Sequence, residues 1–142
     1  MTLYEVIRGL EKVAKTHPLV KIADDGSIYD ICNTAGIEYG AFIVTQNTHR
    51  QTEQFDYYGL TLFYVDRLIG KNMEDNRLEI QSFAKQLLGN VIHVFCDEYD
   101  IDLPQTITYQ PFTQKFLDET AGQYAQFELE IPIDIMCAEE FE

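Results

Sequence analysis

The sequence predicts an α+β domain in which two helices pack against one face of a mostly antiparallel sheet. Apolar residues recur at helical spacing in two segments, one at the N-terminus and one after residue 76. Apolar and polar residues alternate strictly from residue 124 to 133, as in a strand with one buried face. With 142 residues, we expect a single domain at 1–134, followed by an acidic tail at 135–142.

The first helix is expected to begin at a capping box. The Thr2 hydroxyl can accept a hydrogen bond from the Glu5 amide, while the Glu5 side chain reaches back to Thr2. An apolar stripe follows, and the proline of residues 17–18 should end the helix, because the residue before a proline disfavours helical backbone. A turn at 24–27 and a short strand at 28–31 are expected next.

Two strands are then expected, an apolar one at 39–44 and an aromatic-rich one at 58–65. The segment between them, 45–57, is polar and has no glycine or proline to make a tight turn. Two interpretations fit this pattern. Either the strands continue well beyond their apolar parts, or a long arm projects from the domain.

The second helix is expected to follow a loop at 70–76, with Asn76 as its N-cap and Glu79 as the acid at its third position. Its apolar stripe is wide and continues to Phe95, which indicates a helix facing a sheet.

A closing hairpin should complete the domain. Its strands are expected at 106–112 and 123–133, with a connecting loop at 118–122. Pro111 and Pro132 have no amide donor, so both belong at a sheet edge, a bulge or a strand end.

The negative charge is concentrated in the last third of the chain. Residues 1–96 hold 12 acidic and nine basic residues, whereas 97–142 hold 12 acidic residues and one basic residue, Lys115. A phosphate-binding surface needs Lys or Arg, so this third is not expected to grip nucleic acid. It could repel nucleic acid, or the acid could serve solubility alone.

Membrane and secretory segments are not expected, because no apolar run approaches 18 residues. The chain has three cysteines, an odd number, and they are far apart at Cys32, Cys96 and Cys137. This favours reduced thiols in a protein made in a cytoplasm.

The candidates for chemistry are few. A thiol–imidazole nucleophile would combine Cys96 with His93, which also shares a helix face with Asp97, but a structural role is favoured because no oxyanion donors accompany them. The stretch 25–28 imitates part of a calcium loop, yet the ligand positions around it hold Lys, Ala and Cys. The acids of 97–102 could hold a divalent ion weakly, although a solvated loop is favoured. We therefore expect no catalytic, cofactor or metal site.

The order of these elements resembles that of tail-terminator and neck proteins, the head–tail connector rings of tailed phages, over residues 1–134. The segment ITYQPFTQKFLDETAGQYAQFELEIPIDIMC, 107–137, is also similar to the closing hairpin of neck proteins from phages of gut Bacteroides, including crAss-like ones. The resemblance implies a structural virion protein without catalytic residues, made in the host cytoplasm. It would form a homo-oligomeric ring of six or twelve subunits and contact other neck, portal or tail-tube proteins.

In such a ring DNA must pass without specific binding. We expect Glu128 and Glu130 to face the channel and repel phosphates. The segment 45–57 could add backbone hydrogen bonds to the sheet edge of a neighbouring subunit. The expected interface side chains in this segment are Gln46, Asn47, Arg50, Gln51 and Gln54.

Two other functions fit the composition. An acidic adaptor or DNA mimic would bind a basic partner as a monomer or dimer. A small-molecule-binding protein or thiol enzyme would need a concave pocket around Cys96 and His93.

Overall fold

The computed structural model describes residues 1–33, 38–69, 73–116 and 118–133. Its elements, in chain order, are α1 (Leu3–Lys15), β1 (Ile22–Asp25), α2 (Ile28–Cys32), β2 (Ala41–Gln51), β3 (Phe55–Arg67), α3 (Met73–Glu98), β4 (Thr108–Lys115) and β5 (Glu119–Pro132). The predicted α+β class is confirmed. The expected tail at 135–142 and Cys137 lie outside the described residues.

The sheet is mixed rather than mostly antiparallel. Its strand order is β1-β2-β3-β5-β4; β1 runs parallel to β2, and the other neighbouring strands are antiparallel. The sequence did not indicate β1, because this strand has only four residues and ends in Asp24 and Asp25, which are typical of a turn.

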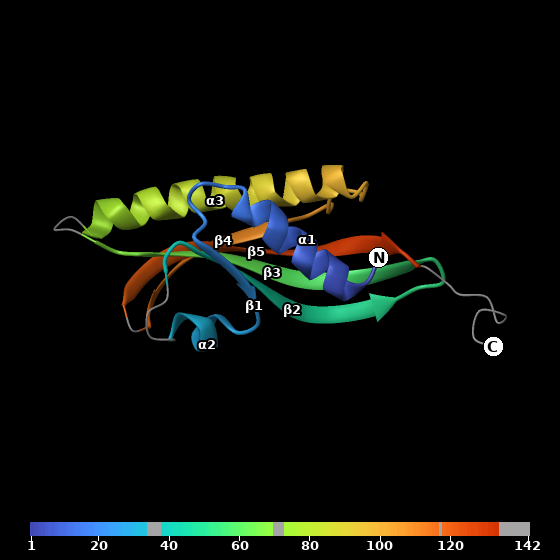
Figure 1. The fold of residues 1–142 in the computed structure, drawn as a ribbon, viewed down its shortest axis with the longest axis horizontal. Helices are drawn as coiled ribbons and strands as arrows, with labels where there is room; N and C mark the ends of the chain where they lie inside the picture. The colour runs from blue at the N-terminus through green and yellow to red at the C-terminus, as the bar shows by residue number, and fades with distance from the viewer. Residues whose placement is uncertain (34–37, 70–72, 117, 134–142) are drawn as a thin grey trace.

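Three helices, not two, accompany the sheet in the described residues. As expected, α1 and α3 cover one face, whereas α2 lies on the other (Figure 1). The predicted strand at 28–31 is wrong, since these residues belong to α2. Ile28 and Cys32 are four residues apart, so a helical turn buries both against Ile43 and its neighbours on that face.

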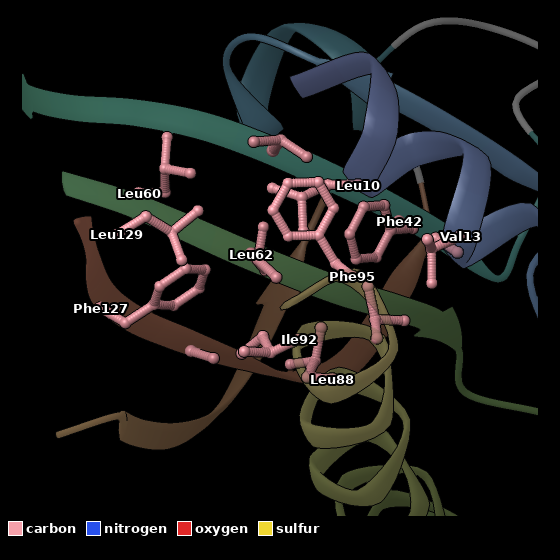
Figure 2. Close-up of a cluster of buried hydrophobic side chains, with 14 of the residues drawn as sticks. Leu10, Val13, Phe42, Leu60, Leu62, Leu88, Ile92, Phe95, Phe127 and Leu129 are labelled. Carbon is pink, nitrogen blue, oxygen red and sulfur yellow. The ribbon is translucent and has the colours of Figure 1, made fainter. Parts of the chain in front are cut away.

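The main core lies between α1, α3 and the sheet. Figure 2 shows Leu10 of α1 and Phe95 of α3 converging on Phe42 and Leu62 of the central strands. All four side chains are fully buried. The helices approach closely at Gly9, where an added Cβ would lie 2.8 Å from the Phe95 ring.

The two long helices begin differently. The capping box of α1 is confirmed: the Glu5 amide donates to the Thr2 hydroxyl at 3.2 Å, and the Glu5 carboxylate accepts from the Thr2 amide at 3.3 Å. The predicted N-cap of α3 is wrong, because the helix begins at Met73. Asn76 instead accepts a hydrogen bond from the Ile69 amide at 3.0 Å.

Most of the polar segment between the central strands is strand, and only 52–54 form the connection. The ladder between β2 and β3 continues to Gln51 and Asp56, with one irregularity between Gln46 and Thr48. The first interpretation, that the strands continue beyond their apolar parts, is therefore confirmed. All side chains from 46 to 54 are exposed.

The alternation in the last strand is confirmed. Its buried set is Ala125, Phe127, Leu129 and Ile131. The predicted loop at 118–122 is wrong beyond its first residue, because 119–122 belongs to β5. These four residues pair with β4, and 120–122 also pair with β3. Pro111 lies in the edge strand β4 and Pro132 ends β5, as expected. Within the described parts of the chain, none of the helices has the apolar length that a bilayer crossing requires.

Replacement of Phe95 by Ala is expected to lower the free energy of unfolding by about 3–5 kcal/mol, because it leaves a cavity where the two helices meet the sheet. Val94 is the matched control: it is the preceding residue and is 50% exposed. Val94→Ala should change stability by less than about 0.5 kcal/mol. Denaturant unfolding measures both, and similar losses in the two variants would contradict this description of the core.

Candidate functional site

The predicted site residues Arg50, Glu128 and Glu130 lie together on the sheet face opposite α1 and α3. Arg50 of β2 pairs with Tyr57 of β3, which in turn pairs with Glu130 of β5. Residues paired across strands share a face, and Glu128 is two residues from Glu130, so it lies on this face as well. The neighbouring residues of β5, Phe127 and Leu129, point to the helical side.

Arg50 is held by contacts within its own chain. Its Nη2 donates to Glu128 Oε1 at 2.9 Å and its Nε donates to Glu128 Oε2 at 3.2 Å. Its guanidinium carbon also lies 3.9 Å from the centre of the Tyr57 ring, a cation–π contact. The hydrogen bond from Arg50 to Glu128 raises the pKa of Arg50, which therefore stays charged.

A hollow of about 380 Å³ adjoins this ion pair. Its wall combines Arg50, Tyr57, Glu128 and Glu130 with residues 102–106, the segment that precedes β4. Among the described residues, the carboxylates of Glu130 and Asp102 have no hydrogen-bond or ion-pair partner. The hollow thus holds three carboxylates and one guanidinium, and its net charge is negative.

The other predicted interface residues lie on the same hairpin but are not gathered into one site. Gln46 pairs with Leu60 and shares the helical face with it. Asn47, at the irregularity in β2, donates to the Thr61 hydroxyl. Gln51 ends β2, and the backbone oxygen of Gln54 accepts from the Ile133 amide.

The thiol and imidazole of the enzyme alternative are not arranged for nucleophilic catalysis. Cys96 is 2% exposed within the core, and burial raises the pKa of its thiol to about 11. His93 lies on the exposed side of α3, and the structure gives it no hydrogen bond to Asp97. A thiol that is protonated and shielded from solvent is a poor nucleophile.

The acids that the structure brings together differ from those that the sequence suggested. In the described residues, the only group of three possible metal ligands within 4.8 Å of one another is Glu11, Asp24 and Asp25. Arg8 donates to Glu11 and, at 3.0 Å, to Asp25. The acids of 97–102 form no such group. The imitation of a calcium loop at 25–28 comprises the last residue of β1, two connecting residues and the first residue of α2.

The Arg8–Glu11 pair has a measurable electrostatic consequence. Burial raises the pKa of Glu11, and the hydrogen bond from Arg8 only partly opposes this effect. The folded state therefore binds a proton at Glu11 more readily than the unfolded state does. The resulting stabilisation is present at low pH and is lost as the pH rises through the raised pKa.

Replacement of Glu11 by Gln should raise the free energy of unfolding at neutral pH, because Gln is uncharged and can still accept from Arg8. The gain should disappear at acidic pH, below the raised pKa of Glu11, where the wild-type carboxyl takes up its proton. Denaturant unfolding at both pH values measures the difference. Glu53→Gln, at an exposed acid in the turn between β2 and β3, is the control and should show no such gain.

The two buried cysteines are expected to resist thiol reagents in the folded protein. In a Cys137→Ser background, Cys32 and Cys96 should not react with a chromogenic disulfide at about pH 8, because burial raises the pKa of each thiol to about 11. Both should react after unfolding in denaturant. Rapid labelling of Cys96 in the native protein would instead favour the thiol-enzyme alternative.

No protein-family model matches the chain, and no curated protein matches it. The resemblance to phage neck proteins therefore stays a prediction from the sequence.

Proposed function

We propose that the chain is a structural subunit, not an enzyme, of a ring at the head–tail junction or the tail end of a tailed phage. The observation that carries this proposal is the ordered hairpin of β2 and β3, whose side chains from 46 to 54 are all exposed. In Figure 1 it extends past the ends of α1 and α3. An ordered, polar surface of this kind suits contact with a partner.

The burial of Cys96 and the exposure of His93 also support a structural role, because they argue against the enzyme alternative. A ring of identical subunits needs one surface that meets a different surface of its neighbour. The exposed side chains of Gln46, Gln51 and Gln54 are available for such a contact. Arg50 is less available, since Glu128 and Tyr57 hold it within the subunit.

The proposed channel surface is the negative hollow beside β5. Arg50 offsets the charge of Glu128, so Glu130 and Asp102 supply most of the repulsion there. Repeating this group in every subunit would add to the field that keeps DNA phosphates away from the wall. Adjacent neck, portal or tail-tube proteins would hold the ring within the virion.

Negative-stain microscopy of the purified protein and analysis of purified virions test this function. Rings in either preparation, with the chain present in virions, are the expected result. A protein that is absent from virions and competes with DNA for a basic partner would instead be the acidic adaptor, and the ring proposal would be wrong.

The channel is tested by the double variant Asp102→Asn/Glu130→Gln, which should lower phage infectivity while rings still form, because phosphates would meet a less repellent wall and the Arg50–Glu128 ion pair stays intact. The control is Glu74→Gln/Glu79→Gln, two exposed acids at the start of α3. It removes the same charge elsewhere and should leave infectivity unchanged. Equal effects of the two variants would contradict the channel assignment.

A further inference from the structure

One rim of the sheet is open where β1 stops. β1 pairs with β2 only from Ala41 to Val44, and within the described residues no strand covers the same side of β2 from 45 to 51. Figure 1 shows β2 continuing past the end of β1 to the hairpin. A hollow of about 510 Å³ begins at this step and is lined by Asp25, Gly26, Thr45 and Gln46, among others.

The opposite rim is β4, which has β5 as its only partner strand among the residues that the structure describes. The two rims share an unusual composition. The chain has 24 acidic residues, yet only three stretches of 14 or more residues lack Asp and Glu: 39–52, 80–96 and 103–117. The second lies within α3, and the other two contain β2 and β4. The two uncovered strands are therefore free of the charge that makes close approach of two copies unfavourable.

We propose that the open rim of β2 in one copy of this chain pairs with β4 of the next copy, so that the sheet continues from subunit to subunit. β4 runs antiparallel to β2 within one subunit, because each step from β2 through β3 and β5 to β4 reverses the direction. A neighbour in the same orientation thus offers an antiparallel partner. Strand addition of this kind supplies affinity through backbone hydrogen bonds.

The end of β1 limits the register of this pairing. β1 blocks the rim up to Val44, so Lys115, the last residue of β4, can reach only as far as the start of the open segment. Placing Lys115 opposite Gln46 puts it near the end of β1, where the exposed Asp24 has its carboxylate within 4.8 Å of those of Asp25 and Glu11. Lys115 is the single basic residue after residue 96, and it meets an acidic strand end.

Two irregularities keep this contact short. β2 is irregular between Gln46 and Thr48, and Pro111 has no amide to donate. In the proposed register Asn47 is skipped at the irregularity, as it is in the pairing with β3, so Thr48 lies opposite Gln114 and Pro111 lies opposite Gln51, at the end of the paired segment. Such features limit the length of strand pairing at a sheet edge and make it more selective. The contact is therefore selective and weak for an isolated pair of subunits, and ring closure strengthens it.

This inference extends the proposed function. It rests on the proposed ring only in one respect, that copies of the chain associate with one another. The test is cross-linking of the full chain, in a Cys137→Ser background, with a short bifunctional maleimide at high protein concentration. The double variant Thr48→Cys/Gln114→Cys should give a ladder of dimers, trimers and larger species. Either single variant should give no ladder. Thr48→Cys/Ser82→Cys, with the second thiol on the exposed side of α3, is the matched control.

Charge reversal provides a second measurement. Lys115→Glu should lower the cross-linked yield of the double variant several-fold, and adding Asp24→Lys to the same chain should restore it. Failure of this rescue would overturn the proposed register.

The outcomes separate this inference from the proposed function. Dimers from the Thr48→Cys variant alone would mean that β2 pairs with β2, which overturns the inference. Rings seen by microscopy without a ladder would overturn it too and leave the ring intact. A ladder from a protein absent from virions would support the inference and remove the phage role. Neither ring nor ladder would contradict both.

Discussion

The burial of Phe95 between α1, α3 and the sheet is the contact on which the rest of the structure depends. Gly9 lets the two helices approach closely enough for the Phe95 ring to reach Leu10 and the central strands. The two helices cover that face over the main core, whereas Gln46, farther along the same face, stays exposed. On the opposite face α2 covers the sheet only near β1 (Figure 1).

The sequence predicted the elements that local patterns specify. The capping box at Thr2, the apolar stripe of α3 and the alternation in β5 all act over a few residues, and each is confirmed. Predictions failed where local chemistry was ambiguous. Asn76 suits an N-cap, yet it binds the Ile69 amide from within the helix. The apolar pattern of the short segment 28–31 fits a strand as well as a helix. Burial of Ile28 and Cys32 against the sheet favours the helix.

The predicted site residues illustrate the same limit. The alternation in β5 placed Glu128 and Glu130 on the polar side of a strand, but it could not indicate that Arg50 reaches Glu128. These two residues are 78 positions apart, and their contact depends on the strand order β2-β3-β5. The group of Glu11 with Asp24 and Asp25 was missed for the same reason, since α1 and β1 come together only in the folded chain.

The position of β5 has a consequence for how the protein is made. β5 is the last strand in chain order, yet it lies inside the sheet, between β3 and β4. While the ribosome is still adding residues after 118, β3 and β4 have no common neighbour, and the apolar side of β3 is only partly covered. Strand pairing over long sequence separations is slow. A nascent or truncated chain without β5 therefore lacks the finished sheet on which the proposed ring depends.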